Sequence, residues 1–290
     1  PINLSIILPA KNEASALREL LPGLRELFPD AEILVVNDGS TDDTVAVCEA
    51  VGVTVISHPY SKGNGAAVKT GARNAEGKYL VFMDADGQHK PHEIEKLIGM
   101  LDDGYDLAVG ARQRSDQANN ARWAANTLYS KLASLVVGRR VDDLTSGFRA
   151  CDAAKFREFL HMLPNGFSYP TTSTMAFFRA GYSVGFVPID VASRQDGSKS
   201  HIRPFRDGAR FLLIIFRVGT LYSPLKLFLP ISLFFFFSAL GYYGYTVTTA
   251  GRFTNGTGLL FITSVLVFLI GLVSEQITHL LYSTRPDSEQ

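Results

Sequence analysis

The stretch YLVFMDADGQH, residues 79–89, joins a short apolar run to a cluster of polar residues. The apolar run predicts a buried strand, and it ends in two carboxylates, Asp84 and Asp86, with Gln88 close behind. In open α/β sheets, ligands bind beyond the carboxyl ends of the strands. Two hard oxygen donors with a polar neighbour suit a diphosphate that carries Mg²⁺ or Mn²⁺. Alternatively, Asp86 caps a helix that Pro91 opens.

The segments on both sides repeat this order of apolar run, polar loop and helical spacing. Further strands are predicted over residues 4–8, 33–36, 53–56 and 107–110. Leucines at helical spacing predict a helix over residues 14–27, Thr41 or Asp42 can cap the next, and another covers residues 123–137. Strands that alternate with helices in this way predict a doubly wound, mostly parallel sheet.

Polar loops follow three of these strands, over residues 9–13, 37–39 and 84–86. Because parallel strands end at one edge of the sheet, we expect the three loops to meet there. The glycine-rich run over residues 62–69 lacks the Gly-Lys-Ser/Thr ending of a phosphate-binding loop. We therefore expect a helix start with close backbone packing in that run.

The charge is balanced but unevenly placed. Lys and Arg together number 28, as do Asp and Glu, which argues against nucleic acid as a partner. Residues 194–226 carry seven basic residues against two acidic ones, as is typical of a cytoplasmic segment beside anionic lipid. Cys48 and Cys151 lack metal-site spacing, so we expect free thiols in a reducing compartment. Residues 1–10 predict a first strand, not a signal peptide.

The C-terminal part predicts a membrane anchor. Residues 227–251 are twenty-five uncharged residues, and twenty-two more lie between Arg252 and Glu275. A hydrocarbon core needs about 20 helical residues, so each stretch can span. A turn within residues 248–257 would return the chain to its basic side. Upstream, residues 205–222 mix arginines with apolar residues and predict a helix in the membrane interface.

Three motifs together resemble the family-two glycosyltransferases of GT-A fold: VVNDGSTDDT (residues 35–44), FMDADGQH (82–89) and DLTSGFRA (143–150). Within that family the chain is similar to the dolichol- and undecaprenyl-phosphate hexosyltransferases. The resemblance implies a Rossmann-like, mostly parallel α/β domain that faces the cytoplasm. The implied domains are the catalytic domain (residues 1–204), an amphipathic region (205–222), a transmembrane hairpin (223–282) and a cytoplasmic tail (283–290).

The resemblance also implies a site for the nucleotide sugar and its metal. The nucleotide sugar would bind at Pro9, Ala10, Glu13, Asp38, Asp84 and Asp86. Mg²⁺ or Mn²⁺ on the diphosphate would be held by Asp86 and Gln88, with Asp84 beside the nucleotide as a further ligand. A divalent ion neutralises the charge left on the departing oxygen. The alternatives are a turn-forming role for Asp38 and a solvent-facing Gln88.

An acceptor phosphate requires cationic residues, and arginine forks match its geometry. The resemblance places it on Arg112, Arg122, Ser146, Arg194 and Lys199. Catalysis is then assigned to Asp86, Arg112, Arg122 and Asp143, with Asp143 orienting the acceptor or an arginine, or else forming a turn. Residues 146–149 predict a turn that presents the Arg149 guanidinium. Asn126 stands where a serine is expected near the phosphate, a departure from the family pattern.

No histidine is needed as a base in this reaction. The second pKa of a phosphate monoester is about 6, so at neutral pH the nucleophile is already largely dianionic. His89 and His92 flank Pro91 at a helix start, and we expect both to be exposed and not to bind the metal.

These features predict a metal-dependent, inverting hexosyltransferase of the inner (plasma) membrane. The donor would be of the UDP-glucose or GDP-mannose type, the acceptor a polyprenyl phosphate, and the oligomeric state is left open. One alternative is a processive polysaccharide synthase. It is disfavoured because two spans cannot line a channel and because Gln117 stands five residues before Arg122, which breaks the Gln-x-x-Arg-Trp signature. The other is a non-catalytic scaffold that binds a nucleotide or a protein, although Asp86, Arg122 and Arg194 are all present.

Overall fold

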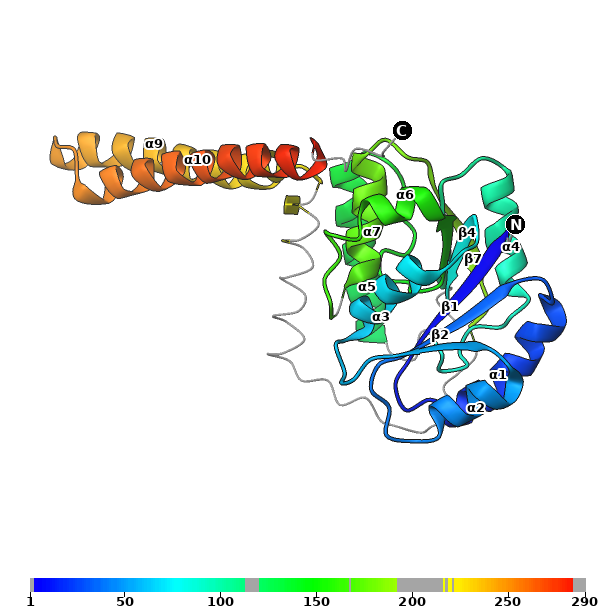
Figure 1. Cartoon of the computed structure of the whole chain (residues 1–290). Helices are drawn as coiled ribbons and strands as arrows, with labels where there is room; N and C mark the ends of the chain where they lie inside the picture. Colours follow the sequence, from blue (N-terminus) through cyan, green and yellow to red (C-terminus); the bar gives the residue numbers. More distant parts are fainter. Residues whose placement is uncertain are drawn as a thin grey trace. The chain divides into compact units, whose positions relative to one another are not determined.

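The computed structural model describes residues 3–112, 120–166, 168–191, 216, 219–220 and 222–283, without the side chains of residues 120–125, 281 and 283. The chain divides into two compact units, Pro1–Ile214 and Ile215–Gln290 (Figure 1). The predicted amphipathic region therefore lies almost entirely outside the described residues, as do most of the C-terminal tail and the Arg194 to Lys199 run. The two units are treated separately below.

A seven-stranded sheet forms the centre of the N-terminal unit. Its strands are β1 (Leu4–Ala10), β2 (Glu32–Asn37), β3 (Thr54–Ser57), β4 (Tyr79–Phe82), β5 (Leu107–Arg112), β6 (Arg149–Asp152) and β7 (Val184–Ile189). They lie in the order β3-β2-β1-β4-β6-β5-β7, and only β6 runs antiparallel to its neighbours. The five predicted strands are confirmed, as is the mostly parallel sheet. β6 and β7 have no counterpart among the predicted strands.

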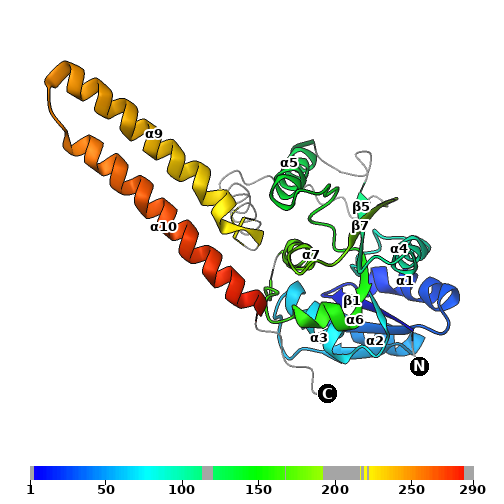
Figure 2. The same ribbon diagram turned by 90° about the horizontal axis from the view of Figure 1, so that it is seen from above.

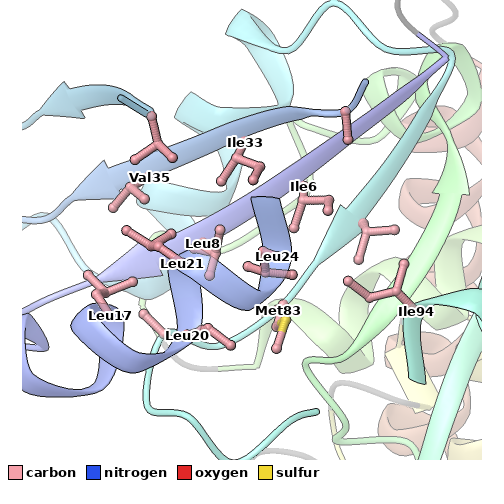
Figure 3. Close-up of a cluster of buried hydrophobic side chains, with 14 of the residues drawn as sticks. Ile6, Leu8, Leu17, Leu20, Leu21, Leu24, Ile33, Val35, Met83 and Ile94 are labelled. Atoms are coloured by element: carbon pink, nitrogen blue, oxygen red, sulfur yellow. The ribbon is translucent and has the colours of Figure 1, made fainter. Parts of the chain in front are cut away.

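Helices cover both faces of this sheet. They are α1 (Ala14–Leu27), α2 (Thr44–Val51), α3 (Asn64–Asn74), α4 (Glu93–Asp102), α5 (Asn120–Val137), α6 (Ala153–Glu158) and α7 (Tyr169–Arg179). The side chains of α1, α2 and α4 share one core with alternate residues of β1, β2 and β4 (Figure 3). α3, α6 and α7 lie on the opposite side (Figure 2). Strands covered on both faces are apolar throughout, which explains the continuous runs in the sequence.

The glycine-rich segment packs closely, as predicted. A Cβ at Gly65 would lie 2.0 Å from the carbonyl oxygen of Pro164, and one at Gly63 would lie 2.6 Å from that of Asn165. A Cβ at Gly71 would lie 2.3 Å from Cγ2 of Ile7 in β1. Glycine is therefore required for α3 to approach both the sheet and the loop that precedes α7.

The C-terminal unit contains two long apolar helices, α9 (Pro224–Ala250) and α10 (Asn255–Ser283). Both are long and apolar enough to cross a membrane, and their most apolar windows are only 11% and 17% buried. Polar contacts join them: Ser232 and Ser264 each donate a hydrogen bond to the other's carbonyl oxygen, at 2.9 and 3.0 Å. Glu275 accepts from the backbone N–H of Leu225 at 3.1 Å and so satisfies the start of α9.

Candidate active site

The polar ends of β1, β2 and β4 meet the start of α3 in one cleft of about 380 Å³. All six residues predicted to bind the nucleotide sugar line it: Pro9, Ala10, Glu13, Asp38, Asp84 and Asp86. Parallel strands bring these loops together because their carboxyl ends share one edge of the sheet. We call this cavity the carboxylate cleft. That it binds a nucleotide stays a prediction.

Asp38 follows β2 and is only 4% exposed. Its Oδ1 accepts hydrogen bonds from His58 Nδ1 and the Lys62 N–H, both at 2.7 Å. Its Oδ2 accepts from Ser61 Oγ at 2.7 Å and from the Gly63 N–H at 2.9 Å. Burial raises the pKa of Asp38, but these hydrogen bonds outweigh burial and lower it to about 2. Asp38 therefore fixes the loop that leads into α3, in addition to any contact with a nucleotide.

His58 is a site residue that the sequence analysis missed. Its Nδ1 faces Asp38, and its Nε2 lies 2.9 Å from Thr70 Oγ1 in α3. Because an ionised carboxylate can only accept, Nδ1 carries a proton and donates it to Asp38. His58 follows β3 directly, so its position after a strand was the available signal.

The loops after β1 and β2 are tied to each other by side chains. Asn12 has a φ of 57°, and its Oδ1 accepts from the Thr41 N–H at 2.7 Å. Ser40 Oγ in turn accepts from the Asn12 N–H at 2.9 Å. Asp42 Oδ2 accepts from the Ala14 N–H at 3.0 Å and satisfies one donor at the start of α1. The acidic motif after β2 thus shapes the wall of the cleft.

Residues 86–88 form a compact turn, which we call the Asp86 turn. Asp86 Oδ1 accepts from the Gln88 N–H at 3.1 Å, and Gly87 between them has a φ of 73°. α4 begins two residues after Pro91 and has no side-chain cap. The alternative in which Asp86 caps this helix is therefore wrong.

The carboxylates of the cleft fit a divalent cation by donor chemistry. Asp84 and Asp86 are half-buried and line the same cavity. Among the described residues, no three His, Cys, Asp or Glu side chains form a complete metal site. A Mg²⁺ ion bound to a diphosphate needs only one or two protein carboxylates, since phosphate oxygens and water supply the other ligands. A contact from Gln88 stays a prediction.

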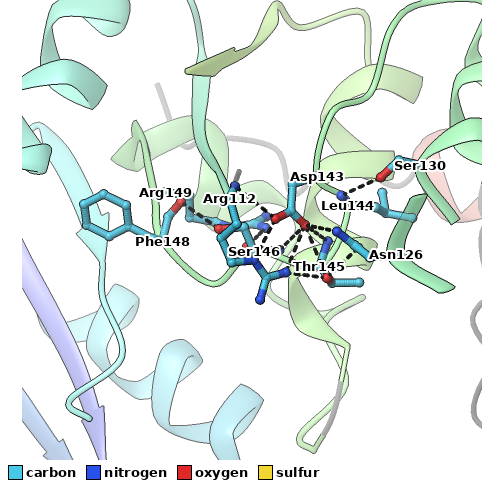
Figure 4. A network of polar contacts seen from close by, with 9 residues as sticks. All are labelled: Arg112, Asn126, Ser130, Asp143, Leu144, Thr145, Ser146, Phe148 and Arg149. Atoms are coloured by element: carbon cyan, nitrogen blue, oxygen red, sulfur yellow. Dashed lines mark hydrogen bonds and ion pairs between the residues drawn. The ribbon is translucent and has the colours of Figure 1, made fainter. Parts of the chain in front are cut away.

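A second polar centre lies where β5 ends, and we call it the arginine network (Arg112, Asn126, Asp143 and Thr145; Figure 4). Arg112 Nε donates to Asp143 Oδ2 at 2.8 Å, and its Nη2 donates to Oδ1 at 3.1 Å. Asn126 and the Thr145 N–H also donate to Oδ1, at 3.2 and 3.0 Å. The Asp143 side chain is 1% exposed, whereas that of Arg112 is 31% exposed. Asp143 therefore orients Arg112 and also forms a turn, so both of its predicted roles are present.

The ion pair between Arg112 and Asp143 stabilises the charged form of each side chain. Burial lowers the pKa of Arg112, but the hydrogen bonds to Asp143 raise it above its ordinary value. Burial raises the pKa of Asp143, but the hydrogen bond and charge of Arg112, with the hydrogen bonds from Thr145 and Asn126, lower it below its ordinary value. Arg112 therefore offers a permanent positive charge at the carboxyl edge of the sheet.

The prediction that Arg149 is presented on a turn is wrong. Arg149 begins β6 and is 0% exposed. Its Nη1 donates to Pro170 O at 2.9 Å and Ser173 Oγ at 2.7 Å, and its Nη2 donates to Ser146 O. Burial lowers the pKa of this guanidinium. Arg149 thus anchors the preceding loop to α7 from below the surface.

That loop approaches the carboxylate cleft. A Cβ at Gly147 would lie 3.0 Å from Asp84 Oδ2, so the backbone of this loop lies close to the Asp84 carboxylate. The Tyr169 hydroxyl donates to Gly147 O at 3.1 Å and holds the loop from the other side. The charge of Asp84 also contributes to the raised pKa of Arg112. The cleft and the arginine network are therefore neighbours.

The prediction that His89 is exposed is wrong. His89 is 6% exposed, and its ring stacks on Phe148 with centroids 4.7 Å apart and planes inclined by 11°. Burial lowers the pKa of His89 to about 4, so the ring is neutral at pH 7. The stack joins the Asp86 turn to the loop before β6. His92, in contrast, has a side chain that is 56% exposed, as predicted.

The structure describes only some of the residues that are predicted to bind the acceptor phosphate. Ser146 is 1% exposed, with its hydroxyl 3.5 Å from Phe148 O. Arg122 lies in α5, but its side chain is outside the described residues. Arg194 and Lys199 are outside the described residues altogether. Phosphate binding by these four stays a prediction.

Comparison with known protein families identifies the family of the domain that carries this site. Residues 5–160 match the family described as Glycosyl transferase family 2. The chain belongs to this family. Residues 223–280 match a second family, the GtrB C-terminal hairpin, and cover nearly all of α9 and α10. The N-terminal unit is thus a glycosyltransferase domain, and the family-two membership predicted from the motifs is confirmed.

Named relatives cover most of the chain. Polyprenol monophosphomannose synthase of Mycolicibacterium smegmatis is 32% identical over 68% of this chain and 82% of its own. Undecaprenyl-phosphate mannosyltransferase of Micrococcus luteus is 30% identical over 66% of this chain and 84% of its own. Glycosyltransferase AglJ of Haloferax volcanii is 27% identical over 83% of this chain and 77% of its own.

Solved structures share the fold. Glucosyl-3-phosphoglycerate synthase of Mycobacterium tuberculosis, crystallised with Mn²⁺, uridine diphosphate and glucosyl-3-phosphoglycerate, has a TM-score of 0.60 and 22% identity. The match covers 76% of this chain and 79% of that one. The GT-A architecture predicted from the sequence is confirmed.

Proposed function

We propose that this glycosyltransferase moves a hexose from a nucleotide sugar to the phosphate of a membrane polyprenyl phosphate, with inversion at the anomeric carbon. The relatives from M. smegmatis and M. luteus are named for polyprenol and undecaprenyl phosphate, which supports this acceptor class. The donor is of the UDP-glucose or GDP-mannose type.

The observation that carries the proposal is the adjacency of two unlike centres. The carboxylate cleft holds two half-buried carboxylates that suit a metal-bound diphosphate. The arginine network beside it holds a guanidinium in place through a buried carboxylate while leaving it partly exposed. Carboxylates suit a donor diphosphate that carries a metal ion, and a guanidinium suits the anionic phosphate of the acceptor.

In the reaction, an oxygen of the acceptor phosphate attacks the anomeric carbon while the bond from that carbon to the diphosphate breaks. The lipid gains the sugar and the nucleoside diphosphate leaves. Asp84 and Asp86 would hold Mg²⁺ or Mn²⁺, which neutralises charge on the leaving diphosphate when bound. Arg112 binds and orients the acceptor phosphate, and Asp143 positions Arg112. The phosphate is already deprotonated at neutral pH, so no general base is required.

The hairpin supports a membrane location for the reaction. We propose that α9 and α10 cross the inner membrane and that the catalytic unit faces the cytoplasm, because the segment before α9 is rich in basic residues. A long isoprenoid chain gains about 0.8 kcal/mol per buried methylene in the bilayer. The enzyme must therefore work at the membrane surface.

A transfer assay tests the proposal. Purified full-length protein receives polyprenyl phosphate, Mg²⁺ or Mn²⁺, and UDP-glucose, UDP-galactose, UDP-N-acetylglucosamine or GDP-mannose separately, and lipid products are identified by mass spectrometry. One donor should yield a lipid-linked monosaccharide, and Asp86→Ala should remove the product. The matched control is Asp103→Ala, which removes an exposed carboxylate just after the end of α4 and should leave the yield of product unchanged. Nucleotide binding without lipid product from any donor would overturn the proposal.

A further inference from the structure

Asp38 accepts four hydrogen bonds from the protein itself. Its Oδ1 accepts from His58 Nδ1 and from the Lys62 N–H, both at 2.7 Å. Its Oδ2 accepts from Ser61 Oγ at 2.7 Å and from the Gly63 N–H at 2.9 Å. An ionised carboxylate has about four acceptor positions on its two oxygens. The protein therefore fills these positions, although Asp38 lines the carboxylate cleft.

Three of the four donors are held in place by the fold. The His58 ring is buried, and its Nε2 lies 2.9 Å from Thr70 Oγ1 in α3. The two backbone donors belong to the loop that precedes α3, and this loop is packed on two sides. A Cβ at Gly39 would lie 2.8 Å from a backbone nitrogen of the loop, and one at Gly63 would lie 2.6 Å from Asn165 O. Removing any of these donors from Asp38 would shift packed backbone or a buried ring.

The Ser61 hydroxyl is the donor that can leave. Ser61 is exposed and lines the carboxylate cleft, and rotation about one side-chain bond moves its oxygen. Ser61 Oγ also accepts a hydrogen bond from Lys11 Nζ at 3.1 Å. Lys11 is exposed and lines the same cleft. Ser61 therefore covers one acceptor position of Asp38 on the side where a ligand would enter.

The chemistry of Asp38 indicates which groups of a ligand it would meet. Burial raises the pKa of Asp38, but its hydrogen bonds lower it to about 2, so the carboxylate is ionised at pH 7 and only accepts. Uracil and guanine each carry a ring N–H on their base-pairing edge, whereas phosphate groups that are fully ionised carry no donor. A base N–H is therefore complementary to Asp38, but it needs an acceptor position that Ser61 fills.

We propose that the Ser61 hydroxyl competes with a ring N–H of the donor nucleobase for Oδ2 of Asp38, so that Ser61 sets the affinity of the enzyme for its nucleotide. This inference rests on the proposed function. When the nucleotide binds, the hydrogen bond from Ser61 to Asp38 breaks and one from the base forms. The freed hydroxyl then donates to water or to the ligand while it still accepts from Lys11.

Removal of this hydroxyl should tighten nucleotide binding. In Ser61→Ala, water takes the place of the hydroxyl on Asp38, and water returns to bulk solvent more readily than a side chain finds a new partner. One net hydrogen bond corresponds to an affinity for UDP or GDP that is about fivefold higher than in the wild type. Isothermal titration calorimetry on full-length protein with Mg²⁺ measures this change.

The matched control is Ser183→Ala. Ser183 is also exposed, and its Oγ donates to a carboxylate, Asp106 Oδ2, at 2.8 Å. It directly precedes β7, which runs parallel to β5, and so lies at the edge of the sheet opposite to the carboxylate cleft. Ser183→Ala should bind nucleotide as the wild type does. Chemical unfolding should show that neither variant is more stable than the wild type, so that a gain in affinity is not a gain in folding.

Methylated bases identify the competing group. UDP methylated at N3 of uracil and GDP methylated at N1 of guanine lack the ring N–H but keep the ribose and the diphosphate. Ser61→Ala should bind these analogues no more tightly than the wild type does. An equal gain for methylated and ordinary nucleotides would overturn the inference, because the gain would then come from a ribose hydroxyl or from added space in the cleft.

Two other results would also overturn the inference. Weaker or unchanged binding of UDP and GDP by Ser61→Ala would show that the hydroxyl supports the site and does not compete for it; nucleotide binding by the wild type would still agree with the proposed function. Absence of binding in both proteins would overturn the inference and the proposed function together. Tighter binding by Ser61→Ala without any lipid product would support the competition while the proposed transfer fails.

Discussion

The carboxylate cleft and the arginine network each contain one buried aspartate that shapes a loop, but the two are satisfied in different ways. Asp38 is held by the His58 ring, the Ser61 hydroxyl and two backbone N–H groups. Asp143 is held chiefly by the guanidinium of Arg112. The cleft thus combines carboxylates with the ammonium of Lys11, which lies 3.1 Å from Ser61 Oγ, whereas the network holds a guanidinium in an ion pair with a buried carboxylate. The carboxylates of the cleft suit an anionic donor that brings its own cation, and the guanidinium of the network suits a bare phosphate.

Asp143→Ala should have the largest effect because it leaves Arg112 partly buried without its carboxylate. Breaking a buried ion pair costs about 3–5 kcal/mol of unfolding free energy. We expect a loss of this size in chemical unfolding of the full-length protein, together with loss of transfer. Asp142→Ala, in the exposed pair with Arg140, is the control and should cost less than about 1 kcal/mol. Similar losses in the two variants would show that the network is no more than a surface contact.

Asp38→Asn should have a smaller effect. The amide keeps the shape, but one of its two terminal atoms becomes a donor and faces N–H or O–H groups that also donate. Leaving buried groups unsatisfied costs about 1–3 kcal/mol. We expect stability to fall by this amount and nucleotide affinity to fall with it, measured by unfolding and by calorimetry. Asp30→Asn, at an exposed position, should change neither.

The pH dependence of the stability difference between the wild type and Asp38→Asn follows from the direction in which folding shifts the pKa of Asp38. The folded pKa of Asp38 is about 2, below its ordinary value of 3.8, so the ionised form stabilises the fold. This contribution, about 2 kcal/mol from the shift, is fully present above pH 3.8 and is lost as the pH falls through 2. The gap between wild type and Asp38→Asn should therefore stay constant from pH 7 to about pH 4 and then shrink. A gap that instead changed near pH 6 would assign the effect to another group.

His89→Phe should have the smallest effect. The ring is buried, stacked and neutral at pH 7, so a phenyl ring preserves the contact with Phe148. We expect a change of less than about 1.5 kcal/mol in stability and near-normal transfer. His89→Ala leaves a cavity and should be clearly less stable. Loss of transfer in His89→Phe at normal stability would instead assign a chemical role to a ring nitrogen.

The sequence was sufficient for the carboxylate cleft because local patterns define it. An apolar run followed by a polar loop predicts a strand end, and parallel strands place those ends together. The six residues predicted to bind the nucleotide sugar therefore line one cavity. Two apolar stretches of sufficient length likewise predicted the α9 and α10 hairpin.

Only the tertiary structure decided which polar groups are buried. Residues 146–149 have a turn-like sequence, yet Arg149 begins an antiparallel strand between β4 and β5 and contacts α7, more than 20 residues away. The exposure of His89 depends on Phe148, and the partner of Asp38 is His58, each distant in sequence. Strand and helix periodicity report local conformation and the direction of a side chain. Burial and pairing depend on which distant segments meet, and no local pattern specifies that.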